Sequence, residues 1–141
     1  MSLKGKLVHV ELTDVGKVRE HNEDALDARP DIGLWVLADG MGGYNAGEVA
    51  SGIAVAMVPT EIRQLTEQQR LKGMRDEEVQ KLIATQASKV NTAIYTAAQS
   101  QSQYAGMGTT LVIAYWHGDR VTVGHLGDSR CYRLRGAEIK A

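Results

Sequence analysis

The run of apolar residues from Leu34 to Ala38 constrains the fold more than any other feature, because Asp39 and Gly40 follow it directly. A short apolar run bounded by glycine-containing turns is typical of a strand that is covered on both faces. We therefore expect a central strand over residues 34–38. A carboxylate at the tip of such a strand is costly unless a cation or hydrogen bonds compensate its charge.

Two segments have the apolar periodicity of helices. Asn45 is followed three residues later by Glu48, which resembles a capping box, and the helix that starts there is expected to end at Pro59. A longer helix is predicted from Asp76 to about Ala98. The polar residues between the helices, 64–75, are expected to form a surface connection.

The remaining segments favour strands, and we expect them at residues 7–11, 25–28, 109–116, 121–126 and 130–135. The last three are predicted to form a meander. This order predicts an α+β domain in which antiparallel sheets are covered by an antiparallel helix pair. Residues 137–141 look like the start of a returning strand, so we expect the strand at 130–134 to lack a neighbour and the chain to be a fragment.

Composition excludes several classes of protein. The chain has 141 residues, the length of one domain, and its 16 basic and 17 acidic residues argue against capture of nucleic acid or of an anionic membrane. No apolar stretch has the roughly 20 residues of a membrane span, and no signal peptide is recognisable. Cys131 is the only cysteine, which fits a reducing compartment. We expect a cytoplasmic protein.

Acidic residues mark a candidate metal site. Glu23 and Asp24 are adjacent, so in an extended segment only one of them readily binds a given ion directly, and the other is left to orient water. Asp39 can bridge two ions if Glu23 reaches the same place, and the carbonyl of Gly40 is another oxygen ligand. Oxygen donors without His or Cys favour Mg²⁺ or Mn²⁺ over zinc. Arg19 has the side chain best matched to a phosphate.

Each of these residues also has an ordinary explanation. An isolated Arg or a Glu-Asp pair in a loop is usually solvated, and Asp39 is suited to a turn or a helix entry. Their joint occurrence favours the metal site.

Four ordered motifs resemble the bacterial metal-dependent Ser/Thr protein phosphatases of type 2C, and they lie at residues 16–25, 38–43, 107–110 and 124–130. The resemblance implies an antiparallel β-sandwich flanked on each side by helices, a four-layer αββα arrangement, of which residues 1–141 would be the N-terminal portion of a single domain. It implies hydrolysis of phosphoserine and phosphothreonine in proteins phosphorylated by a Ser/Thr kinase. The water would be activated by two Mg²⁺ or Mn²⁺ ions.

The resemblance also implies roles for individual residues. Glu23, Asp39 and the carbonyl of Gly40 would bind metal, Asp24 would hydrogen-bond to metal-bound water, and Arg19 would bind the substrate phosphate. Asp128 would bind a third, weaker ion, although a structural role in its Gly-Asp-Ser-Arg turn is equally consistent with the sequence.

Two departures from the family pattern limit these expectations. Animal members have a histidine where this chain has Met41, whose thioether cannot donate a proton, so the general acid is unassigned. Bacterial members commonly have methionine there. The later Ser-Asp-Gly and Asp-Asn segments, whose aspartates complete the metal shell, are absent from these residues. We expect at most weak metal binding and little catalysis from this polypeptide alone.

Two other functions are consistent with parts of the sequence. A strand, a glycine-rich turn and a helix also describe a dinucleotide-binding module, but Asn45 occupies the position of its third glycine. Alternatively, an incomplete fragment acts as an interaction domain, associating with itself through the unpaired strand edge at 130–134.

Overall fold

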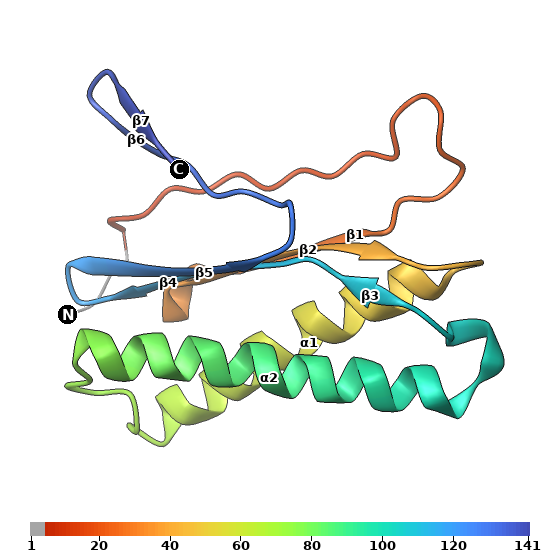
Figure 1. Ribbon diagram of the computed structural model, residues 1–141. Helices are drawn as coiled ribbons and strands as arrows, with labels where there is room; N and C mark the ends of the chain where they lie inside the picture. The colour runs from red at the N-terminus through yellow and green to blue at the C-terminus, as the bar shows by residue number, and fades with distance from the viewer. Residues whose placement is uncertain (1–4) are drawn as a thin grey trace.

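The computed structural model describes residues 5–141, in which a five-stranded antiparallel sheet carries two helices on one face (Figure 1). The main strands lie side by side in the order β1 (Asp24–Arg29), β2 (Leu34–Met41), β4 (Leu111–His117) and β5 (Arg120–Leu126). The short strand β3 (Gly108–Thr109) pairs with the end of β2. The predicted α+β class with antiparallel strands is confirmed.

The strand β2 lies between two neighbours but is covered on one face only. Leu34, Val36 and Ala38 are at most 2% exposed and belong to the core that the helices complete. The alternate residues face the other side of the sheet, which we call the open face, and Leu37 there is 37% exposed. The expected central strand is therefore confirmed, whereas the expectation that both its faces are covered was wrong, because both helices lie on the same side (Figure 1).

The prediction of a strand at residues 7–11 was wrong. This segment runs along the open face without entering a ladder, since the pairings within residues 5–141 involve other segments (Figure 1). Val8, Val10 and Leu12 are each at least 86% exposed. One contact with the sheet is the edge-to-face packing of His9 on Trp35, whose ring centroids are 5.9 Å apart.

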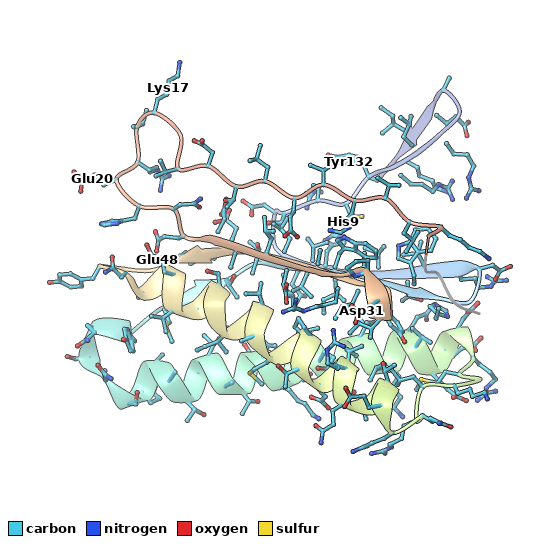
Figure 2. The ribbon with its side chains drawn as sticks, turned by 180° about the vertical axis from the view of Figure 1, so that it is seen from behind. His9, Lys17, Glu20, Asp31, Glu48 and Tyr132 are labelled. Carbon is cyan, nitrogen blue, oxygen red and sulfur yellow. The ribbon has the colours of Figure 1, made fainter. Side chains whose placement is uncertain are left out.

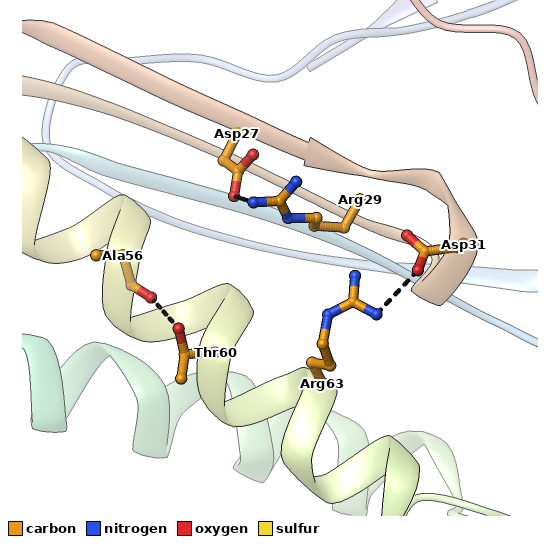
Figure 3. A network of polar contacts seen from close by, with 6 residues as sticks. All are labelled: Asp27, Arg29, Asp31, Ala56, Thr60 and Arg63. Carbon is orange, nitrogen blue, oxygen red and sulfur yellow. Dashed lines mark hydrogen bonds and ion pairs between the residues drawn. The ribbon is translucent and has the colours of Figure 1, made fainter.

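The helix α1 (Ala46–Glu67) continues through Pro59, so its expected end was wrong and the connection to α2 is shorter than predicted. Proline removes one backbone hydrogen bond, but Val58 and Ile62 on either side are fully buried, and this packing offsets the loss. After the proline, Thr60 Oγ1 donates a hydrogen bond of 2.7 Å to the carbonyl of Ala56 (Figure 3).

An ion pair joins α1 to the short helix η1 (Pro30–Ile32) that follows β1. Arg63 Nη1 lies 3.0 Å from Asp31 Oδ2, and the hydrogen bond from this guanidinium lowers the pKa of Asp31 (Figure 3). The helix α2 (Asp76–Ser100) confirms the predicted second helix and runs antiparallel to α1 (Figure 1). A second short helix, η2 (Ser102–Tyr104), leads from α2 to β3.

The predicted meander is confirmed for β4 and β5 but was wrong for its third strand. β6 (Arg133–Arg135) pairs with β7 (Glu138–Lys140) in a separate hairpin, and not with β5. The left-handed backbone of Gly127, with φ +92°, turns the chain away from the sheet after β5. The strand expected to lack a neighbour therefore has one. Among the helices within residues 5–141, none is both long and apolar enough to cross a membrane.

Candidate metal centre

Asp24 and Asp39 lie opposite each other where β1 and β2 are paired. Directly opposed residues of an antiparallel pair have their side chains on the same face. Because Asp39 alternates with the buried Ala38, both carboxylates are on the open face, and both keep access to solvent. The sheet thus brings together two acidic residues that are 15 positions apart in the sequence.

The proximity of Asp39 alters the acidity of Asp24. Partial burial raises the pKa of Asp24, and the negative charge of Asp39 and a hydrogen bond with its side chain raise it further. Burial, the charge of Asp39 and the hydrogen bond all disfavour the state in which Asp24 and Asp39 are both ionised. A divalent cation between them would remove the repulsion.

The side chain of Glu23 lies on the other side of the strand, against the first turn of α1. A Cβ added to Gly47 would come within 1.9 Å of Glu23 Oε2, so this carboxylate touches the helix backbone. The Oε2 atom is buried and has no hydrogen-bond partner. A buried carboxylate oxygen without a partner is costly, and a bound cation would satisfy it.

The main chain of Glu23 is fixed by two hydrogen bonds. Its carbonyl accepts one from the Gly40 amide at 3.0 Å and one from Ser51 Oγ at 2.8 Å. A Cβ on Gly40 would lie 1.9 Å from the Gly47 carbonyl oxygen, which shows why glycine is required where β2 passes the start of α1. The main chains of Glu23 and Gly40 are therefore held side by side.

The other predicted site residues, Arg19 and Asp128, lie in exposed loops. Arg19 is exposed in the loop before β1, and the neighbouring Lys17 and Glu20 point away from the sheet at its tip (Figure 2). Met41 is 55% exposed at the end of β2. Asp128 is exposed in the turn after β5.

The donor set fits a hard divalent cation but is incomplete. Glu23, Asp24 and Asp39 offer carboxylate oxygens, which are ligands that Mg²⁺ and Mn²⁺ prefer. Within residues 5–141, however, no group of three or more His, Cys, Asp or Glu side chains is arranged to hold a metal ion. Glu23 and the Asp24–Asp39 pair therefore offer part of a coordination shell.

The family model described as protein phosphatase 2C matches residues 16–141. The chain belongs to the protein phosphatase 2C family. The serine/threonine phosphatase stp of Listeria welshimeri is 34% identical to this chain over 137 residues, which are 94% of this chain and 52% of the relative. The chain thus spans about half the length of the Listeria and Streptococcus pneumoniae phosphatases it matches.

Solved phosphatase structures share the fold. The serine/threonine phosphatase Stp1 of Staphylococcus aureus superposes with a TM-score of 0.76 at 31% identity, over 92% of this chain and 50% of that structure. The catalytic domain of the phosphatase PstP in complex with two manganese ions superposes with a TM-score of 0.72 at 36% identity, over 88% of this chain and 49% of that structure.

Three residues of this phosphatase 2C chain shape the site although no role was predicted for them from the sequence. Gly47 makes room for the Glu23 carboxylate, and Thr110 and Ser129 form hydrogen bonds behind Asp39. A signal for Gly47 was available, because glycine in the first turn of a helix costs stability and indicates a close approach. The two hydroxyl residues lie inside the family motifs, but no sequence spacing predicts their contact.

Proposed function

We propose that this chain is the N-terminal portion of a single type 2C phosphatase domain that hydrolyses phosphoserine and phosphothreonine in proteins. The observations that carry the proposal are the buried, unpartnered Oε2 of Glu23 on the helix side of the strand and the Asp24–Asp39 pair on its open face, both next to the Gly40 backbone. The relatives are named serine/threonine phosphatases, which supports the same reaction.

Glu23, Asp39 and the carbonyl of Gly40 would hold two Mg²⁺ or Mn²⁺ ions, and Asp128 would bind a third, weaker one. The two manganese ions in the PstP structure support a centre with two metal ions. Bound there, the ions would lower the pKa of water and neutralise charge on the phosphoryl group. The choice between Mg²⁺ and Mn²⁺ stays a prediction.

Asp24 and Arg19 are assigned to water and substrate. The Asp24 carboxylate lies on the open face beside Asp39, where it can accept a hydrogen bond from the attacking water and orient it. Arg19, in the loop that leads into Glu23, would bind the phosphate with its planar fork of donors. Met41 has no proton to give, so the group that protonates the leaving oxygen lies outside the residues assigned here.

The other expectations from the sequence stay predictions. They are a phosphoprotein substrate of a Ser/Thr kinase, a cytoplasmic location, and no binding of nucleic acid or membrane. Self-association through an unpaired edge at residues 130–134 is not favoured, because β6 pairs with β7. The dinucleotide-binding alternative is not favoured, because β2 is antiparallel to both of its neighbours, whereas that fold has a parallel sheet.

Phosphate release from a phosphothreonine peptide in Mn²⁺ tests the proposal. Residues 1–141 alone should turn over slowly or not at all, since the metal shell is incomplete. A chimera that adds the part of the Listeria phosphatase outside the match should release phosphate, and Asp39→Asn should abolish the release. A folded chimera that binds Mn²⁺ but releases no phosphate would contradict the proposal.

A further inference from the structure

Thr110 forms hydrogen bonds with both the carbonyl and the amide of Asp39. The flanking pairs Leu37–Val112 and Gly40–Thr109 place Asp39 opposite Thr110 in the sheet. The Thr110 amide donates to the Asp39 carbonyl at 2.9 Å, as in an ordinary ladder. In the other direction the Asp39 amide donates to the Thr110 side-chain oxygen, Oγ1, at 3.0 Å. A hydroxyl thus occupies the place of a main-chain acceptor.

The same hydroxyl reaches the turn that carries Asp128. Thr110 Oγ1 lies 2.7 Å from Ser129 Oγ, and Thr110 is only 5% exposed. Because Thr110 Oγ1 accepts from the Asp39 amide, its own proton is free for Ser129, and it retains a lone pair if Ser129 donates instead. Three groups are therefore connected, namely the Asp39 amide, the Thr110 hydroxyl and the Ser129 hydroxyl.

Packing of the turn on Thr110 supports the connection independently. A Cβ on Gly127 would lie 2.8 Å from Thr110 Cγ2, so the turn backbone rests on the threonine methyl group. Arg130 Nη1 donates a hydrogen bond of 3.1 Å to the Gly127 carbonyl and closes the turn. The position of this turn relative to β2 is thus fixed by Thr110.

We propose that Thr110 and Ser129 are positioning residues that form a hydroxyl relay between Asp39 and the Asp128 turn. The relay sets the backbone of Asp128 at a fixed place relative to Asp39 and so couples the weaker metal ligand to the main site. The functional part of this inference rests on the proposed phosphatase function. The relay itself concerns hydrogen bonds of the metal-free chain.

Amide hydrogen exchange of the metal-free protein, followed by NMR, tests the relay. Thr110→Val keeps the side-chain shape and removes the hydroxyl, so the Asp39 amide should exchange at least about tenfold faster relative to the amide of Val36 in the same strand. Thr110→Ser should restore the wild-type ratio, and Ser129→Ala should give an intermediate one. Normalising to Val36 separates this effect from global destabilisation.

Thr109→Val is the matched control, because the Thr109 hydroxyl donates to the Thr110 carbonyl at 2.8 Å and has no hydrogen bond to Asp39. It should leave the ratio unchanged. An unchanged ratio in Thr110→Val, no recovery in Thr110→Ser, or an equal effect of Thr109→Val would each overturn the relay.

Electron paramagnetic resonance of free Mn²⁺ tests the coupling. Ser129→Ala removes no proposed metal ligand, yet it should weaken Mn²⁺ binding about tenfold because the turn that carries the ligand Asp128 loses its hydrogen bond to Thr110. Loss of a residue that orients a metal ligand commonly has an effect of this size. Wild-type affinity in Ser129→Ala would overturn the coupling. Absence of any Mn²⁺ binding by the wild-type chain would instead contradict a metal centre formed by residues 1–141 alone, and the exchange ratios would then decide the relay.

Discussion

Asp24 lies directly opposite Asp39 in the β1–β2 pairing, with both carboxylates on the face of the sheet that the helices leave open. Like charges placed directly opposite each other destabilise a sheet. The fold therefore keeps an unfavourable pair at the position where a cation is proposed to bind. Conflict between stability and local charge is common at functional sites.

The Asp24–Asp39 pair predicts a pH dependence of stability in metal-free buffer. The pKa of Asp24 is raised above 3.8 in the folded state, so between 3.8 and the raised value the folded chain binds more protons than the unfolded chain. The contribution of Asp24 to the free energy of unfolding therefore falls as pH rises through this window. Asp24→Asn should remove that fall and stabilise the protein at neutral pH by a few tenths to about 1 kcal/mol.

Urea unfolding at pH 3 and pH 7 in EDTA measures this effect. The matched control is Asp27→Asn on the same strand, because Asp27 pairs with Arg29 at 3.2 Å and its loss should bring no gain (Figure 3). Equal effects of the two variants at pH 7, or a gain from Asp24→Asn that is as large at pH 3, would count against the charge repulsion.

The contact between Gly40 and Gly47 predicts opposite results for two Gly→Ala variants. In Gly40→Ala the new Cβ would meet the Gly47 carbonyl oxygen, and we expect a loss of about 1 to 3 kcal/mol. In Gly52→Ala, within α1, nothing lies within 4 Å, so alanine should stabilise the helix by about 0.5 to 1 kcal/mol. Denaturant midpoints followed by circular dichroism provide the comparison, and a tolerated Gly40→Ala would refute the close approach.

Gln86 in α2 predicts a stabilising substitution. It is 1% exposed, and its Nε2 has no hydrogen-bond partner. Gln86→Met conserves the shape and removes the unsatisfied donor, so the free energy of unfolding should rise by about 1 to 3 kcal/mol. Gln99→Met, at an exposed position of the same helix, should change it little. A loss of stability in Gln86→Met would show that this amide has a partner.

The unpartnered Glu23 oxygen predicts that Mn²⁺ stabilises the chain. At ten times the dissociation constant, one bound ion adds about 1.4 kcal/mol to the free energy of unfolding. Thermal melts in rising Mn²⁺ should show this increase for the wild type and lose it in Glu23→Gln. An equal rise in both proteins would mean that the ion binds elsewhere.

Local patterns predicted the helical layer well. The apolar period of α2 and the capping signal at Asn45 placed both helices, because each of these signals is contained in one segment. Pro59 does not end the helix, since burial of Val58 and Ile62 outweighs a lost hydrogen bond. Residues 7–11 have an extended pattern, but a strand also needs a neighbour to pair with, which a single segment cannot reveal.

The candidate site was only partly predictable. Glu23, Asp24, Asp39 and Gly40 could be proposed as site residues because acidic residues and a glycine-rich turn leave a recognisable pattern. The geometry of the site could not be predicted from the sequence pattern. It depends on the register that puts Asp24 opposite Asp39 and on the hydrogen bond from Asp39 to Thr110, 71 positions away. Contacts between distant segments are decided by packing, which spacing does not encode.

Paramagnetic broadening of amide NMR signals by Mn²⁺ tests the central claim most directly. At substoichiometric Mn²⁺, the signals of Glu23, Asp24, Asp39 and Gly40 should broaden first, and Asp39→Asn should abolish this pattern. Broadening that is centred on other residues, or that persists unchanged in Asp39→Asn, would contradict a metal centre at the paired ends of β1 and β2.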